Sequence, residues 1–173
     1  GNPYRLEREI HGIGFQTADL IARNVGFAAD SPERVQAGIR YLLDQCAESG
    51  HVFMPAVELM EQGRELLGVN AELFPPALER LRADDGIVTE ELRYYLPPLY
   101  NSEMGVTSSL QRLLRTPGAI KLDWTPQAET EDELQLAQSQ QEAITLAASK
   151  KVIVLTGGPG TGKTTVTREI IKL

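Results

Sequence analysis

The feature that most constrains this chain is a glycine-rich segment placed directly after a short apolar run. The run is Val152-Ile153-Val154-Leu155, and the segment is Gly157-Gly158-Pro159-Gly160-Thr161-Gly162-Lys163-Thr164. A continuous apolar run of this length is typical of a strand buried on both faces of a parallel sheet. After the segment, Val166, Ile170 and Ile171 have the spacing of one helix face. Strand, glycine loop and helix in this order predict the start of an α/β domain.

The segment from Gly157 to Thr164 has the form Gly-x-x-x-x-Gly-Lys-Thr, which is typical of a phosphate-binding loop. Glycines allow consecutive backbone N–H groups to turn inward, and the next helix presents its positive N-terminus to the phosphates. We expect Lys163 to reach the β and γ phosphates and the Thr164 hydroxyl to complete a Mg²⁺ site. The alternative is a flexible glycine hinge, but a hinge has no reason to follow a buried strand and end in Lys-Thr-Thr.

Gln140 is a second candidate for the same site. It lies seventeen positions before Gly157, on an expected helix that leads into the apolar run. Its amide offers an acceptor and two donors, which can match the donor and acceptor on the edge of adenine. Two alternatives remain open: a solvated helix glutamine without a ligand, and the adjacent Gln141 as the functional residue.

The N-terminal residues predict two short helices joined by a glycine turn. Residues 4–10 and 16–25 have helical spacing, with Ala18, Ile21, Ala22 and Val25 on one side of the second helix. The turn between them contains Gly12-Ile13-Gly14, which fits a helix-hairpin-helix that presents backbone N–H groups to a DNA phosphate without reading bases. A plain αα-hairpin, with glycines that serve only the turn, is the alternative.

The middle of the chain predicts further helices and a small hairpin. Ser31-Pro32 indicates a helix start, and the apolar spacing from Val35 to Cys46 continues that helix up to Gly50. Helices are also predicted from Val57 to Gly68, from Pro75 to Gly86 and from Val106 to Arg115, with Pro97-Pro98 as a break before the last. Segments 87–88 and 94–96 are expected to pair as a β-hairpin. Helices followed by a hairpin suggest winged-helix-like packing.

A composition change after residue 116 indicates a domain boundary. We expect a helix-hairpin-helix at 1–30, a helical region at 31–116, a linker at 117–132 and the start of an ATPase domain at 133–173, with Thr130 and Glu133 as a capping box. The net charge of −7 is unevenly distributed. Five acids and no base lie between Glu129 and Glu142, whereas four Lys and one Arg face a single Glu from Lys150 onward. The acidic total therefore does not exclude a nucleic-acid binder.

These motifs carry a resemblance to a known family. Leu136-x-x-x-Gln140-x-x-Ala143 and Val152 to Thr165 resemble the glutamine motif and first ATPase motif of superfamily-1 DNA helicases, and Gly-Gly-Pro-Gly-Thr-Gly-Lys-Thr-Thr is similar to the RecD branch (superfamily 1B). Residues 2–116 resemble the N-terminal region of the longer bacterial RecD-like helicases that act without RecB and RecC. The resemblance implies a RecA-like fold after the mostly α N-terminal region, and movement 5′ to 3′ along single-stranded DNA. The ATP and Mg²⁺ contacts it implies are Gln140, Gly158, Pro159, Gly160, Thr161, Gly162, Lys163, Thr164 and Thr165.

The resemblance implies an ATP-dependent DNA helicase of repair or recombination, cytoplasmic and nucleoid-associated, monomeric, with single-stranded or forked DNA and other repair proteins as partners. Because the loop lies nine residues from Leu173, we expect this segment to be part of a larger enzyme and to be inactive alone. No run of eighteen apolar residues predicts a membrane span, and no leader peptide is evident. Two rivals stay open: a structure-selective DNA-binding or adaptor module attached to a different P-loop ATPase, and a small-molecule kinase.

Other residues receive structural interpretations. His11 and His51 lack neighbouring ligands at metal-binding spacing. Tyr94, Tyr95, Tyr100 and Trp124 are able to stack on bases, but packing is the simpler role. Cys46, the single cysteine, lies on the apolar side of its expected helix and is interpreted as an inert core thiol.

Overall fold

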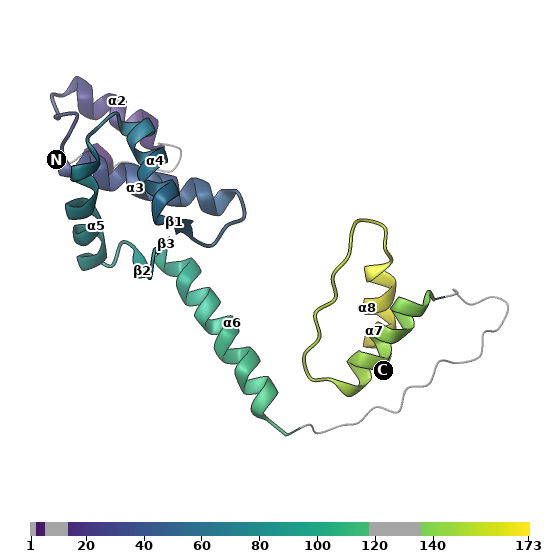
Figure 1. Ribbon diagram of the computed structural model, residues 1–173. Coiled ribbons are helices and arrows are strands. Elements are labelled where there is room, and N and C mark those ends of the chain that lie inside the picture. Colours follow the sequence, from purple (N-terminus) through teal and green to yellow (C-terminus); the bar gives the residue numbers. More distant parts are fainter. Residues whose placement is uncertain (1–2, 6–13, 118–135) are drawn as a thin grey trace. The chain divides into compact units, whose positions relative to one another are not determined.

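The computed structural model describes residues 3–5, 14–117 and 136–173 (Figure 1). The chain divides into two units, residues 1–104 and residues 105–173, and the division falls within one long helix. The described elements, in chain order, are η1 (Pro3–Arg5), α2 (Phe15–Asn24), α3 (Pro32–Glu48), β1 (Met54–Pro55), α4 (Ala56–Leu67), η2 (Ala71–Leu73), α5 (Phe74–Ala83), β2 (Val88–Glu90), β3 (Arg93–Tyr95), α6 (Pro97–Arg115), α7 (Gln138–Ser149) and α8 (Lys163–Ile171).

Helix α3 forms the centre of the first unit. It begins as predicted, with the Ser31 hydroxyl accepting a hydrogen bond from the Arg34 N–H at 3.3 Å and with Pro32 in the first helical turn. It packs against both α4 and α5. The buried apolar side chains at these contacts are Val35, Ile39, Leu42 and Leu43 of α3, Leu59 and Leu67 of α4, and Phe74, Ala77 and Leu81 of α5. The predicted helices in this region are therefore confirmed.

Helix α2 packs on α3 and on η1. Phe15, Ala18 and Ala22 are its buried residues, and the Phe15 ring stacks on Tyr41 with 5.3 Å between centroids. The predicted placement of Val25 on the apolar side is wrong, because the helix ends at Asn24 and the Val25 side chain is 64% exposed. Of the helix expected at residues 4–10, the structure describes a short 3-10 turn at Pro3–Arg5, and the rest, with Gly12 and Ile13, lies outside the described residues.

The predicted hairpin is confirmed and belongs to a three-stranded antiparallel sheet of order β1-β3-β2. Strands β2 and β3 pair with Thr89 opposite Tyr94, and the turn between them places Glu91 at a φ of 53°. Strand β1, which has two residues, was not predicted because so short a segment has no period to detect. Helix α4 begins at Ala56, directly after β1, and the side chain of Val57, where the predicted helix began, is exposed.

The long helix α6 corrects the expectation that Pro97-Pro98 would form a break before a helix starting near Val106. Both prolines lie inside the first turn of α6, which runs from Pro97 to Arg115. Proline is tolerated in the first turn because the N–H groups there have no partner within the helix. Of the predicted linker at 117–132, only Pro117 is described, and the proposed capping pair Thr130 and Glu133 lies outside the described residues.

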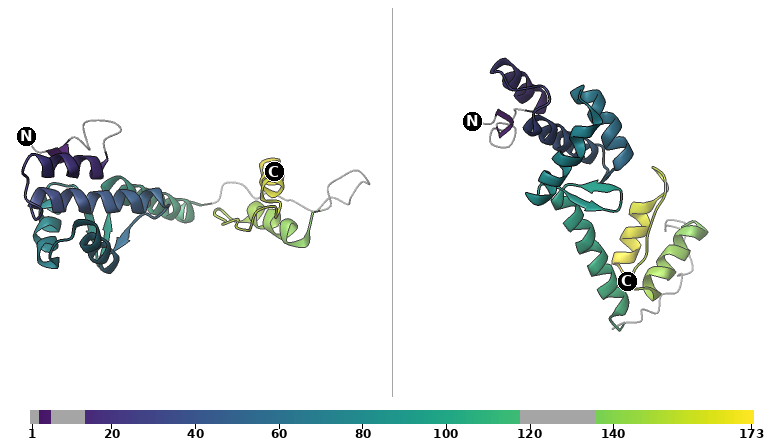
Figure 2. Two further views of the ribbon diagram at one scale, coloured as in Figure 1. Left: turned by 90° about the horizontal axis from the view of Figure 1, so that it is seen from above. Right: turned by 60° about the vertical axis from the view of Figure 1, so that its left-hand side comes forward.

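In the second unit α7 and α8 lie side by side, as Figures 1 and 2 both show, with Ile144 and Val166 buried between them. Helix α7 begins at Gln138, so Leu136, which was expected within it, precedes the helix. The prediction of a strand at 152–155 is wrong for the described structure: these residues belong to no strand, and Val154 is 88% exposed. A strand needs a hydrogen-bonded neighbour, and none of the described segments supplies one.

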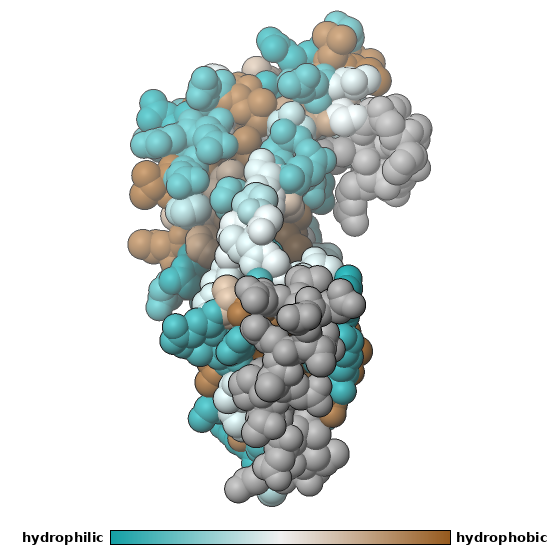
Figure 3. Space-filling view, turned by 90° about the vertical axis from the view of Figure 1, so that its right-hand side faces the viewer, coloured by the Kyte–Doolittle hydropathy of each residue, from teal (hydrophilic) through white to brown (hydrophobic). Residues whose placement is uncertain are grey.

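The surface carries a mixture of side chains. On the face drawn in Figure 3, hydrophilic residues (teal) are interspersed with smaller groups of apolar residues (brown). Among the residues that the structure describes, no helix combines the length and the apolar character that crossing a bilayer requires.

Candidate nucleotide-binding site

The glycine-rich loop connects α7 to α8, and α8 begins at Lys163, inside the motif. Gly160 and Gly162 have φ values of 75° and 77°, a left-handed conformation that favours glycine. Gly162 is the N-cap of α8. The first N–H groups of a helix have no partner within it, so the loop ends on a set of backbone donors at the positive end of a helix.

The Lys163 side chain lies over the backbone of its own loop. Its Nζ donates hydrogen bonds to the carbonyl oxygens of Gly157 at 2.7 Å and Gly158 at 2.6 Å. The Thr161 hydroxyl also donates to the Gly158 oxygen, at 2.9 Å. The cation is therefore held by two carbonyl oxygens of its own loop, and its contact with a phosphate stays a prediction.

The glycines of the loop differ in whether the surrounding atoms leave space for a Cβ. A Cβ at Gly157 would lie 2.8 Å from the Thr161 Oγ1, and a Cβ at Gly162 would collide with the Gln140 Nε2. At Gly158 and Gly160 a Cβ would meet nothing within 4 Å. The backbone at these two residues is open to the outside, which is what close approach of a phosphate requires. The loop therefore fits a phosphate group with donors and a cation.

Gln140 contacts the loop and Gln141 does not take its place. The Gln140 Oε1 accepts from the Ala137 N–H at 2.9 Å, and its Nε2 donates to the Thr161 carbonyl oxygen at 3.3 Å. The Gln141 Nε2 instead donates to the Leu136 carbonyl oxygen at 3.1 Å, at the start of its own helix. The geometry separates the two adjacent glutamines, which the sequence left as competitors.

The remaining loop candidates lie on either side of this cluster. Pro159 is exposed, Thr164 is exposed in the first turn of α8, and the adjacent Thr165 is half-buried. Gln140, Thr161, Gly162 and Lys163 are thus brought together, and Thr164 and Thr165 follow Lys163 directly in the first turn of α8.

Of the three residues proposed to contact DNA, only Gly14 is described. It is the N-cap of α2 in an extended conformation, with φ −83° and ψ 171°. Its carbonyl oxygen accepts from the N–H groups of Thr17 and Ala18, both at 3.1 Å. A Cβ at Gly14 would meet nothing within 4 Å. Neither the backbone conformation nor the packing of the described residues therefore requires glycine at this position.

A largely buried ion pair between Asp19 of α2 and Arg34 of α3 was not predicted from the sequence. The Arg34 Nε donates to Asp19 Oδ1 at 2.7 Å and its Nη2 donates to Oδ2 at 3.0 Å. The Arg34 Nη1 donates to the carbonyl oxygens of Ala29 and Leu67, and the Tyr4 hydroxyl donates to Asp19 Oδ1 at 2.8 Å. A signal was present: Arg34 is a charged residue next to Val35 at the start of a helix whose face is otherwise apolar.

The pKa values of Asp19 and Tyr4 in this cluster shift in opposite directions. Burial raises the pKa of Asp19, but the hydrogen bonds from Arg34 and Tyr4 and the Arg34 charge outweigh it and hold that pKa below its usual value. Burial, together with the hydrogen bond to Asp19, raises the pKa of Tyr4 above its usual value. Asp19 is therefore held charged and Tyr4 neutral, which is the arrangement that a carboxylate accepting several donors favours.

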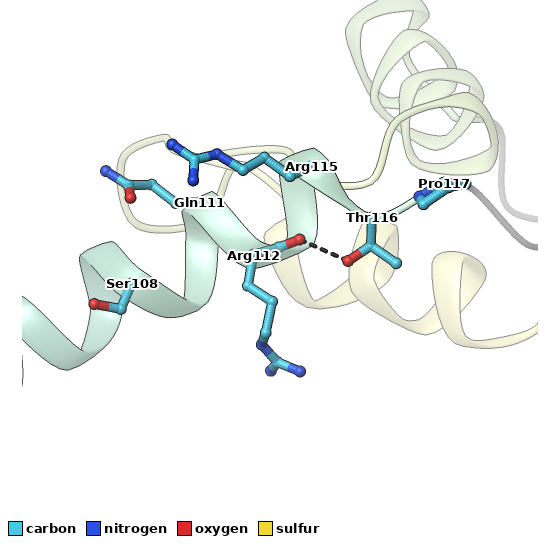
Figure 4. A pocket seen from close by; sticks show the side chains of 6 residues that line it. All are labelled: Ser108, Gln111, Arg112, Arg115, Thr116 and Pro117. Carbon is cyan, nitrogen blue, oxygen red and sulfur yellow. Dashed lines mark hydrogen bonds between the residues drawn. The ribbon is translucent and has the colours of Figure 1, made fainter.

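A shallow hollow of about 420 Å³ lies at the end of α6, lined by Ser108, Gln111, Arg112, Arg115, Thr116 and Pro117 (Figure 4). The Thr116 hydroxyl donates to the Arg112 carbonyl oxygen at 2.7 Å. In Figure 4 the two arginine side chains extend in different directions. The side chains of Arg112 and Arg115 therefore do not converge on a common point in the hollow.

Both ends of the chain match known protein families. Residues 1–53 match the family described as the ATP-dependent RecD2 DNA helicase HHH domain, and residues 140–173 match the AAA domain family. The chain is 32% identical over 185 residues to the ATP-dependent RecD2 DNA helicase of Deinococcus radiodurans, an alignment that covers 95% of this chain. It covers 25% of that helicase, so the chain spans about a quarter of the length of this relative. The N-terminal part of the chain is thus similar to a RecD2 helicase HHH domain, its C-terminal part to an AAA domain, and nearly its whole length to a RecD2 DNA helicase.

Proposed function

We propose that this chain is part of an ATP-dependent DNA helicase and supplies its first nucleotide-binding elements. The observation that carries the proposal is the arrangement of the glycine loop, where Lys163 lies over the loop backbone and Gln140 contacts it from α7. The similarity to a RecD2 helicase over nearly the whole chain supports the same function. The match at both ends of the chain does not favour an adaptor module joined to an unrelated ATPase.

Each residue of the site is proposed to contact a different part of MgATP. We propose that the backbone N–H groups of Gly158 and of residues 160–165 surround the phosphates, with Pro159, which has no N–H, between them, and that Lys163 neutralises the β and γ oxygens. Thr164 would offer its hydroxyl to Mg²⁺, and Gln140 would meet the edge of adenine. When bound, Mg²⁺ would neutralise negative charge on the β and γ phosphates.

Hydrolysis needs groups beyond those of this loop. Phosphoryl transfer uses an acidic Mg²⁺ ligand on another strand, a residue that positions the attacking water and an arginine that stabilises the transition state. We propose that these come from other parts of the helicase, and that the 173 residues bind nucleotide without turning it over at helicase-like rates.

The N-terminal region is proposed to contact single-stranded or forked DNA through the turn Gly12-Ile13-Gly14. The open space around Gly14 supports this, because glycine there is explained by the approach of an outside group and not by the fold. For the whole helicase we further propose 5′ to 3′ movement, a role in repair or recombination together with other repair proteins, a monomeric state and a cytoplasmic, nucleoid-associated location, all by analogy with the family.

The domain limits remain part of this proposal. Residues 1–30 would form the helix-hairpin-helix, 31–116 the winged-helix-like region, 117–132 the linker and 133–173 the start of a RecA-like domain. The element order α3, β1, α4, α5, β2, β3 with sheet order β1-β3-β2 supports the winged-helix-like assignment.

The experiment that tests the function compares Lys163→Ala with Lys172→Ala in the 173-residue chain. Both lysines belong to α8 or its C-cap, but Lys172 pairs with Glu169 at 2.8 Å and lies away from the loop. We expect Lys163→Ala to abolish measurable MgATP binding and to leave DNA binding largely intact, while Lys172→Ala retains both. Equal loss of DNA and nucleotide binding in Lys163→Ala would contradict the assigned role, as would ATP turnover by this chain at helicase-like rates.

A further inference from the structure

Thr161 is the residue through which the loop is tied both to itself and to α7. Its hydroxyl donates to the Gly158 carbonyl oxygen at 2.9 Å, and its own carbonyl oxygen accepts from the Gln140 Nε2 at 3.3 Å. In the pattern Gly-x-x-x-x-Gly-Lys-Thr this position accepts any residue type. The side chain therefore makes a contact that the motif does not specify.

The Gly158 carbonyl oxygen receives two donors, the Thr161 hydroxyl and the Lys163 ammonium at 2.6 Å. A carbonyl oxygen has two acceptor positions, so this pair of donors satisfies it. Lys163 is the group that the proposed function directs toward phosphate. When the ammonium bonds a phosphate, the Thr161 hydroxyl is the donor that stays on Gly158.

Gly157 gives independent support for a defined position of this hydroxyl. Its φ is not in the left-handed region, so its backbone conformation does not demand glycine. A Cβ at Gly157 would instead lie 2.8 Å from the Thr161 Oγ1, closer than real Cβ contacts come. The first glycine of the motif thus leaves room for the Thr161 hydroxyl.

We propose that the Thr161 hydroxyl is a positioning group that holds the backbone from Gly157 to Gly162 in its curved shape while Lys163 is engaged with a nucleotide phosphate. The inference rests on the proposed function, because it assumes that the loop binds phosphate. Thr161 acts through the Gly158 peptide and does not itself neutralise charge.

The first test measures MgATP binding to the 173-residue chain by titration of the loop amide NMR signals. Thr161→Val keeps the side-chain shape and removes the donor, and we expect it to weaken binding about three- to tenfold, the range of one hydrogen bond. Thr161→Ser should restore binding to within about twofold. The matched control is Thr145→Val, whose hydroxyl also donates to a backbone carbonyl, that of Gln141, at 2.9 Å but within α7. Binding by Thr161→Val equal to that of the unchanged chain would overturn the proposal.

A second test needs no nucleotide. In Lys163→Ala the Thr161 hydroxyl is the remaining side-chain donor of the two on Gly158, so Thr161→Val should accelerate amide exchange of Gly158 and of residues 160–162 more in that background than in the unchanged chain. The amides of the buried Ile144 and Val166 should keep their exchange rates. Equal acceleration in both backgrounds would overturn the proposal. If the unchanged chain fails to bind MgATP, the proposed function is contradicted, and this exchange measurement still decides the role of Thr161.

A third test uses the contact between Gly157 and Thr161. Gly157→Ala should weaken MgATP binding in the unchanged chain, because the added Cβ displaces the hydroxyl. In Thr161→Ala the hydroxyl is already absent, so adding Gly157→Ala should weaken binding by less than twofold further. A full, multiplicative loss in the double variant would show that Gly157 serves another purpose and would contradict the proposal.

Discussion

Arg34 of α3 donates two hydrogen bonds, of 2.7 and 3.0 Å, to the carboxylate of Asp19 of α2, and both side chains are largely buried. The same guanidinium donates to the carbonyl oxygens of Ala29 and Leu67, 2.7 and 2.8 Å away. One side chain therefore joins α2, the loop after it and the end of α4. The orientation of α2, whose N-cap is Gly14, depends on this pair.

Removal of the carboxylate should destabilise the fold strongly. Asp19→Ala leaves the Arg34 charge buried without its partner, and we expect a loss of about 3 kcal/mol in the free energy of unfolding. Urea denaturation followed by circular dichroism measures it. The control is Glu79→Ala, which breaks an exposed pair with Arg82 and should change the free energy by less than about 1 kcal/mol. Similar losses in the two variants would contradict the importance of the buried pair.

The same pair should make stability depend on acid pH. The pKa of Asp19 is lowered in the folded chain, so its contribution is present above the unfolded value, about 3.9, and is lost as the pH falls through the folded value. We expect the difference in stability between the unchanged chain and Asp19→Asn to be constant from pH 7 to pH 5 and to shrink below about pH 4. Urea midpoints at several pH values measure it, and a difference that persists undiminished at acid pH would refute this assignment.

Two glycines in helices should respond in opposite directions to alanine. A Cβ at Gly63 of α4 would collide with the ring of Phe74, which is fully buried and unable to move aside, so Gly63→Ala should cost about 1–3 kcal/mol. At Gly105 of α6 a Cβ would meet nothing within 4 Å, and Gly105→Ala should stabilise by about 0.5–1 kcal/mol. Thermal unfolding of both variants checks the pair. A stabilised Gly63→Ala would mean that α4 and α5 pack less closely than the structure describes.

Sequence periodicity predicted the elements whose signals are local. Ser31-Pro32 marked the start of α3, and Gly68, with a φ of 63°, marked the end of α4. The prediction of a strand at 152–155 was wrong because a strand needs a hydrogen-bonded partner from a distant part of the sequence. Strand β1, besides being too short to show a period, and the pair of Asp19 with Arg34 were missed because each exists through a partner fifteen or more residues away. In the loop, the motif predicts Lys163 as a phosphate ligand, which stays a prediction, whereas the hydrogen bond of Gln140 to Thr161 depends on the packing of α7 against α8 and was not predicted.

Gln140 and Gln141 should differ in their effect on nucleotide choice. Gln140 contacts the loop and Gln141 bonds Leu136, so Gln140→Ala should weaken MgATP binding by about fivefold or more, whereas Gln141→Ala should have little effect. If Gln140 also reads adenine, the preference for ATP over GTP should fall in Gln140→Ala. Titration of each variant with both nucleotides measures this. Equal weakening toward ATP and GTP would contradict adenine reading and leave Gln140 as a support for the loop.

The exposed apolar segment before the loop has a consequence for handling this chain in solution. Val154 and Leu155 are exposed, as is Ile171 of α8, and residues 152–155 pair with no strand in the described structure. Unpaired backbone flanked by apolar side chains is a template on which a second chain can add a strand. Preparations of these 173 residues should therefore self-associate as their concentration rises, and a charged residue in place of Val154 should keep them dispersed.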